Sequence, residues 1–89
     1  MMEVFWLQSA LDDLARLWMA ADSALRAAIT AAAHRIDPAL QHDPASKGES
    51  RELDERVFFA YPLGILFTVV EAQQAVFVHS VWRYRRRGE

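Results

Sequence analysis

Three strand-like segments near the end of the chain are separated by connections too short to hold a helix, and this pattern restricts the fold most. β-Branched and aromatic residues fill 57–61, 64–70 and 75–82, and these residue types favour strands. Pro62-Leu63 forms the first connection, and Ala72-Gln73-Gln74 turns the chain before the last segment. Short connections join antiparallel neighbours, so we expect three consecutive strands in an antiparallel sheet.

The beginning of the chain predicts one short strand and a first helix. Residues 4–7 read Val-Phe-Trp-Leu and indicate a strand. Ser9 and Asp12 have the spacing of a capping box, so we expect the helix to begin near Ser9. Its apolar residues recur at the spacing of one helical face, namely Leu11, Leu14, Leu17 and Trp18.

A second helix follows almost without a loop. Asp22 and Ser23 are typical N-cap residues, and the helix then carries an apolar stripe of Leu25, Ile29, Ala32, Ile36 and Leu40. Pro38 is expected to end the regular part, because the residue before a proline is driven toward extended geometry. Residues 41–56 are polar, contain Asp43-Pro44 and Gly48, and predict a connector.

These elements predict an α+β fold in the order β-α-α-β-β-β. We expect the two-helix hairpin to pack on one face of a mostly antiparallel four-stranded sheet. A length of 89 residues fits a single domain spanning 1–89, and a hydrophobic fraction of 53% is sufficient for a core. No apolar run reaches the ~18 residues of a membrane span, and the N-terminus lacks the features of a secretory signal. A cytoplasmic location is therefore expected.

The charge distribution sets the C-terminus apart. Residues 1–82 carry 6 basic and 11 acidic side chains, a net charge of −5, whereas residues 83–89 carry 4 basic and 1 acidic, a net charge of +3. Arg83, Arg85, Arg86 and Arg87 are candidates for binding an anionic partner, since arginine binds phosphate through two donors. Tyr84 lies among them and could stack a base. The alternative is a solvated terminus that binds nothing.

Other polar residues are weaker candidates. Arg56 could extend a basic surface or pair with acidic neighbours, and Arg51 is expected to pair. His79 precedes Arg83 by four residues and has a side chain suited to general acid–base chemistry, although a lone strand histidine is more often structural. His34 and His42 lack the i, i+4 spacing of a helical metal-ligand pair. The chain has no cysteine and therefore no thiolate metal site, and we expect neither a metal nor a cofactor.

Three segments resemble the RelE/ParE toxin superfamily of bacterial toxin–antitoxin systems. They are residues 26–40 with the following Pro44, residues 62–69 (Pro-Leu-Gly-Ile-Leu-Phe-Thr-Val), and residues 76–85, which end in a basic exit. The element order is also that of the superfamily, and the resemblance spans nearly the whole chain. It implies a toxin-like protein that inhibits growth and is held inactive by a cognate antitoxin.

The superfamily implies two kinds of target. RelE-like members cut messenger RNA on the ribosome through attack by the RNA 2′-hydroxyl, and ParE-like members poison DNA gyrase. If the chain is a RelE-like endoribonuclease, its catalytic candidates are Arg56, His79, Arg83 and Tyr84. However, Gly64 stands where RelE-like strands carry an arginine, and 57–59 stand where they carry lysines. The resemblance therefore leaves open an endoribonuclease, a non-catalytic gyrase binder, or an inactive toxin fold that binds a partner protein.

Self-association is a further expectation. If the helices cover only one face of the sheet, aromatic side chains on the other face would be exposed and could join two copies into a homodimer. The candidates are Phe59, Phe67 and Phe77.

Overall fold

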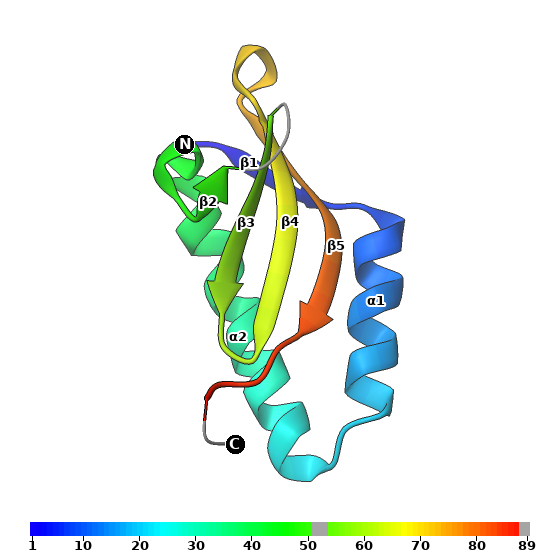
Figure 1. The fold of residues 1–89 in the computed structure, drawn as a ribbon. Helices are drawn as coiled ribbons and strands as arrows, with labels where there is room; N and C mark the ends of the chain where they lie inside the picture. The colour runs from blue at the N-terminus through cyan, green and yellow to red at the C-terminus, as the bar shows by residue number, and fades with distance from the viewer. Residues whose placement is uncertain (51–53, 88–89) are drawn as a thin grey trace.

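The described part of the chain, residues 1–50 and 54–87 of the computed structural model, forms a five-stranded mixed sheet with two helices packed on it (Figure 1). The α+β class and the element order agree with the sequence prediction, with one additional short strand. In chain order the elements are β1 (Glu3–Trp6), α1 (Gln8–Met19), α2 (Ser23–Gln41), the 3₁₀ turn η1 (Pro44–Ser46), β2 (Glu49–Ser50), β3 (Glu55–Ala60), β4 (Leu63–Val70), the 3₁₀ turn η2 (Glu71–Gln73) and β5 (Ala75–Arg83).

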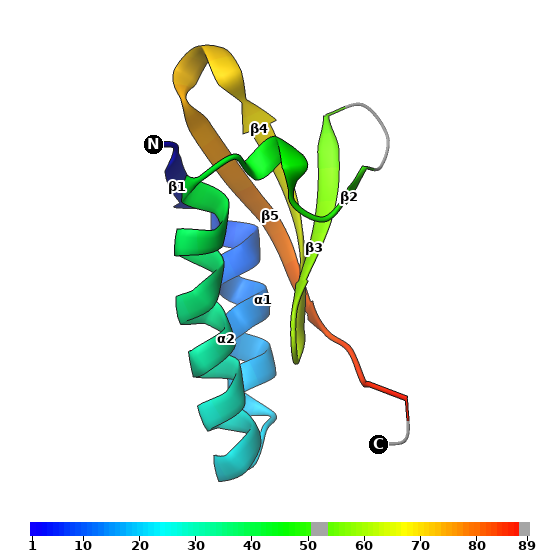
Figure 2. The same cartoon turned by 90° about the vertical axis from the view of Figure 1, so that its left-hand side faces the viewer.

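The sheet order is β1-β5-β4-β3-β2. The three consecutive strands β3, β4 and β5 pair antiparallel, as their short connections predicted. β1 pairs with β5 in parallel, which the intervening helix hairpin makes possible. Figure 2 shows both helices on the same side of the sheet and the other face uncovered. The prediction that the hairpin covers a single face is therefore confirmed.

The hydrophobic core lies between α2 and the central strands. The stripe predicted on the second helix is the buried one, and Ile29, Ala32, Ile36 and Leu40 all belong to the core. They pack against the alternate residues Leu63, Ile65 and Phe67 of β4, together with Val76, Val78 and Val81 of β5. Because successive strand side chains point to opposite faces, the residues between these lie on the uncovered face.

The prediction of four strands missed β2, which lies within the expected polar connector. Two residues are too short to show the alternation by which strands are recognised. Gly48 instead makes the pairing with β3 possible, because its φ is +65° and a Cβ there would lie 1.9 Å from the carbonyl oxygen of Val57. Only glycine tolerates both the left-handed backbone and this close approach. Residues 51–53 of the expected connector, including Arg51, lie outside the described residues.

The predicted capping box and the predicted end of the second helix are wrong. The first helix begins at Gln8 with Leu7 as N-cap, and no capping box forms at Ser9. The Ser9 hydroxyl instead donates to the carbonyl oxygen of His79 at 2.6 Å. Pro38 does not end the second helix, which runs to Gln41. Burial of Leu40 in the core holds the last turn in place despite the hydrogen bond that proline cannot donate. The predicted N-cap Asp22 is confirmed, since its carboxylate accepts from the Leu25 N–H at 2.9 Å.

The strand bounds differ from the prediction by one or two residues, and the β4–β5 ladder contains an irregularity that the sequence did not indicate. Leu66 pairs with Ser80 and Phe67 with Val78, so His79 is an extra residue in β5. Of the three phenylalanines expected to be exposed, Phe67 is fully buried, because it lies on the face toward the helices. Phe59 is 44% exposed, and Phe77 is half-buried against Phe5.

Candidate target-binding site at the end of the sheet

The arginine-rich tail packs against the β3–β4 turn at one end of the sheet. After β5 ends, the backbone N–H of Tyr84 donates to the carbonyl oxygen of Pro62 at 3.0 Å. On the other side of the turn, Arg35 of α2 donates to the carbonyl oxygen of Tyr61 at 2.9 Å. The turn is thus held between α2 and the tail, and the beginning of the tail is not a frayed terminus.

Four aromatic rings from four segments gather at this end. The Phe59 ring meets the Trp82 ring edge-on with centroids 6.3 Å apart and meets the Tyr84 ring at 5.1 Å. Tyr84 in turn contacts Tyr61 at 5.5 Å in the same edge-to-face manner. Edge-to-face pairs at these distances are attractive, each contributing about 0.5–1.5 kcal/mol beyond buried area. Residues from β3, the turn, β5 and the tail therefore form one continuous aromatic surface.

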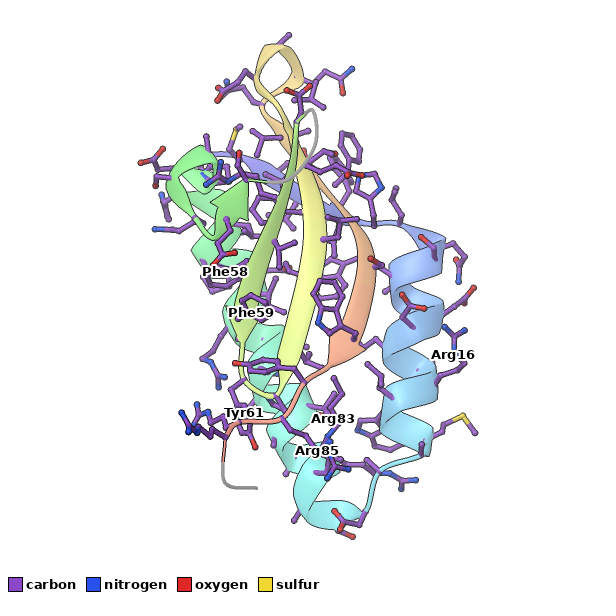
Figure 3. The ribbon with its side chains drawn as sticks, viewed as in Figure 1. Arg16, Phe58, Phe59, Tyr61, Arg83 and Arg85 are labelled. Atoms are coloured by element: carbon purple, nitrogen blue, oxygen red, sulfur yellow. The ribbon has the colours of Figure 1, made fainter. Side chains whose placement is uncertain are left out.

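Arginines adjoin this surface. The guanidinium carbon of Arg86 lies 3.8 Å from the centroid of the Tyr61 ring, a cation–π contact. Arg85, Arg86 and Arg87 are exposed, and Figure 3 shows Arg85 beside Arg83 at the end of the sheet where Tyr61 also lies. We call the following set the aromatic–arginine cluster: Phe59, Tyr61, Trp82, Tyr84, Arg85 and Arg86.

Arg83 is placed differently from the arginines that follow it. It pairs with Leu63, a fully buried core residue, so strand alternation puts Arg83 on the face toward the helices. Its Nε is buried, and the residue as a whole is half-buried. The structure therefore brings Arg86 to the aromatic surface and places Arg83 toward the opposite face of the sheet, and the predicted phosphate-binding role of Arg83 stays a prediction.

His79 lies farther up β5, away from the cluster. Its Nε2 is 2.9 Å from the Thr68 hydroxyl oxygen on β4, and its carbonyl oxygen accepts from Ser9 of α1. Three strand residues separate it from Arg83. The side chain lies on the uncovered face with Thr68, but the structure does not bring it together with the tail arginines. Its catalytic role remains untested.

Arg56 lies farther still. It pairs with Phe67, whereas Ala60 at the other end of β3 pairs with Leu63 in the row of Arg83. Four residues of strand correspond to about 13 Å at ~3.3 Å per residue. The guanidinium group donates to the carbonyl oxygens of Lys47 and Gly48 at 2.7 and 3.1 Å. Arg56 thus holds the segment before β2 against β3, and it shares no site with the tail.

The sequence did not single out Tyr61 as functional, and it predicted Phe59 only as an exposed aromatic residue for self-association. Arg35, which holds the turn beside the cluster, was not singled out either. Tyr61 directly before Pro62 was a local signal, since it lies beside the turn that joins two paired strands. Among the described residues no group of three or more metal-ligating side chains comes together. None of the described helices has the length and hydropathy needed to cross a membrane.

Comparison with solved structures identifies the arrangement. A chain in the chromosomal ParDE TA system from P. aeruginosa has 17% identity and a TM-score of 0.76, with 96% of this chain and 98% of that chain covered. A chain in the RelBE2 toxin–antitoxin complex of Mycobacterium tuberculosis has 15% identity and a TM-score of 0.68, with coverages of 92% and 90%. The chain has the RelE/ParE toxin fold.

The isolated E. coli RelE toxin gives the same result, with 16% identity, a TM-score of 0.65, and coverage of 99% of this chain and 89% of that chain. No protein-family model and no curated protein sequence matches the chain. The RelE/ParE fold is therefore recognised through three-dimensional structure. The predicted resemblance in fold is confirmed.

Proposed function

We propose that the chain is the toxin of a type II toxin–antitoxin pair and that it inhibits growth by engaging messenger RNA during translation. The RelE/ParE toxin fold supports the first part. The observation that carries the second is the Arg86 guanidinium stacked on Tyr61 at 3.8 Å, within a surface of four aromatic rings. Aromatic rings stack unpaired bases, and arginines bind the phosphates between them.

The geometry favours binding as the task of the aromatic–arginine cluster. Cleavage by the 2′-hydroxyl needs a group that takes the hydroxyl proton and another that protonates the departing 5′-oxygen. Apart from its always-charged arginines, the cluster offers only the phenols of Tyr61 and Tyr84 for acid–base chemistry, and a protonated phenol is a poor proton acceptor. His79, the better proton acceptor, is held beside Thr68 outside the cluster. Cleavage of messenger RNA is proposed separately from binding, and Tyr84 is the first residue to test for it.

The antitoxin is proposed to bind elsewhere, in an apolar groove on the helix hairpin. The groove has a volume of about 380 Å³. Trp18 and Leu11 of α1 are 42% and 44% exposed along it, and Ile29 and Ala33 of α2 form its other wall. An amphipathic helix fits such a groove by inserting residues at helical spacing. Two of the similar structures are described as toxin–antitoxin complexes, which supports an antitoxin segment as the occupant.

Inducible expression in bacteria tests the toxin proposal. The wild-type chain should stop growth with a loss of amino-acid incorporation, while plasmid supercoiling stays normal. A double variant, Arg85→Ala with Arg86→Ala, should grow normally. Arg16→Ala, which removes an exposed arginine from α1, is the matched control and should remain toxic. A loss of supercoiling that precedes any effect on translation would contradict the RNA target and favour DNA gyrase.

Primer extension on translated messages in the same cells tests cleavage. New 5′ ends that appear with the wild-type chain and disappear with Tyr84→Phe would support strand scission involving that phenol. Growth inhibition with no new ends would assign the cluster to binding alone.

The antitoxin proposal is tested with the product of any small reading frame adjacent to this gene. Coexpression should suppress toxicity and give a stable complex. Leu11→Glu places a charge in the groove, so it should abolish the complex and leave toxicity intact. A complex that forms equally well with this variant would show that the groove is not the docking surface.

A further inference from the structure

We propose that Trp82 is a base-stacking platform for single-stranded RNA, with Phe59 as its side wall. The inference rests on the proposed function and assigns a specific role within it. It depends on how the indole sits on the sheet, which neither the fold nor the charge of the tail determines.

The Trp82 indole packs on the backbone of Gly64. Phe59, Gly64 and Trp82 lie in one row across β3, β4 and β5. The neighbours of Gly64 along β4, Leu63 and Ile65, point into the core, so Gly64 faces the uncovered side of the sheet. A Cβ on Gly64 would lie 2.6 Å from both Cε2 and Nε1 of Trp82. The indole therefore rests directly on the strand backbone, at a distance that any side chain on residue 64 would prevent.

The neighbouring Phe59 ring stands nearly perpendicular to the indole, so the two rings form a corner. The backbone of Gly64 occupies one side of the indole, and the Trp82 side chain as a whole is half-buried. The Phe59 ring stands at 84° to the indole plane with centroids 6.3 Å apart, and this residue is 44% exposed. A planar base laid on the outer side of the indole would place one edge against Phe59. Such a corner accepts any base, because every base has a stacking face.

Charge complementarity identifies the occupant as a nucleotide of a strand. Tyr84 contacts Phe59 at 5.1 Å and leads directly into Arg85 and Arg86, which are exposed. A base on Trp82 would therefore lie near guanidinium groups, which bind phosphate oxygens. A purely apolar partner would gain nothing from these arginines, whereas a single-stranded nucleic acid would use both the aromatic rings and the arginines. A double-stranded helix cannot use the corner, since its bases are already stacked on each other.

The test compares two RNA probes by fluorescence anisotropy at fixed salt. One is a labelled ten-nucleotide oligoadenylate, and the other is a ten-unit ribose-phosphate strand without bases. The wild-type chain should bind the oligoadenylate roughly 5- to 100-fold more tightly than the abasic strand, the range expected for one stacked base. Trp82→Leu should remove this preference and leave abasic binding unchanged. Arg85→Ala with Arg86→Ala should weaken both probes.

Two further variants separate stacking from folding. Gly64→Ala keeps the indole, but the added methyl group displaces it from the strand backbone. This variant should therefore also reduce the preference for bases. Phe77→Leu removes another half-buried aromatic side chain, one stacked on Phe5 away from the cluster, and should not change it. Circular dichroism and urea titration establish that each variant is folded under the binding conditions.

Two outcomes would overturn the inference, and they have different consequences. If Trp82→Leu retains the full preference for oligoadenylate while the double arginine variant binds weakly, Trp82 is not the base-stacking platform. RNA binding by the cluster would still be supported. If the folded wild-type chain binds neither probe above the level of Arg85→Ala with Arg86→Ala, the platform and the proposed RNA target both fail. A protein target for the aromatic surface would then be favoured.

Discussion

Substitution of Arg56 by alanine distinguishes a residue that holds the fold from one that acts on the target. Arg56 Nε donates to the carbonyl oxygen of Lys47 at 2.7 Å in a half-buried position, and Nη2 donates to that of Gly48 at 3.1 Å near the surface. A hydrogen bond from a charged group contributes about 1.5–3 kcal/mol where it is shielded from water, and much less where it is exposed. We therefore expect Arg56→Ala to lower the free energy of unfolding by about 2 kcal/mol.

This loss is measurable in a chain that still folds. A chain of 89 residues has a total stability of about 5–13 kcal/mol. Urea titration should give a lower midpoint with an unchanged slope, and the melting temperature should fall by roughly 10 °C. Arg56→Lys keeps the positive charge but has one compact donor group in place of the planar fork, so it should lose about half as much free energy of unfolding as Arg56→Ala.

The control for Arg56 is an arginine of the aromatic–arginine cluster. Arg85→Ala removes an exposed side chain, so it should leave the urea midpoint unchanged and weaken RNA binding. Arg56→Ala should show the reverse, with normal binding at temperatures where it is folded. Normal stability of Arg56→Ala combined with a tenfold loss of RNA affinity would refute the structural role and restore Arg56 as a target-binding residue.

Three other substitutions test the packing that supports the site. Gly48→Ala should cost at least about 1–2 kcal/mol for the left-handed backbone alone and should separate β2 from β3, which faster hydrogen exchange at Val57 would report. Asp13→Ala removes a carboxylate that accepts a β5 backbone N–H at 3.0 Å, so it should lower the free energy of unfolding by about 1 kcal/mol, whereas exposed Asp12→Ala should have a smaller effect. Phe67→Ala empties a fully buried position and should cost about 3–5 kcal/mol in urea titration.

Local sequence patterns predicted the main elements because those elements are specified locally. The stripe from Ile29 to Leu40 recurs at helical spacing, and the same residues are buried. The strands around Pro62 follow from β-branched residues and from connections too short for a crossover. Here local propensity and tertiary packing agree, so the pattern was sufficient.

The features that the sequence did not predict depend on contacts between distant residues. Ser9 has the spacing of a helix cap, yet its hydroxyl bonds to His79, 70 residues away. Pro38 resembles a helix end, but burial of the following turn keeps the helix intact. β2 depends on the close approach of Gly48 to Val57. These contacts depend on how separate segments pack in three dimensions, which local residue patterns do not specify.

The same distinction applies to the candidate site. The basic tail was predicted because charge density is a local property of the sequence. The division of its arginines between the two sides of the sheet was not, since it depends on the extra residue His79 in β5, which shifts the alternation of everything after it. Without that shift, Trp82 would lie on the helix-covered face and Arg83 on the uncovered one.

This shift connects the strand irregularity to the proposed activity. An arginine beside Leu63 can keep its charged end at the rim of the helix layer, whereas an indole there would have to enter a filled core. With His79 inserted, the indole instead reaches Gly64, the β4 residue beside it that has no side chain. Tyr84 follows onto the same surface and contacts Phe59. The extra residue in β5 and the glycine in β4 thus act together, and the aromatic–arginine cluster requires both.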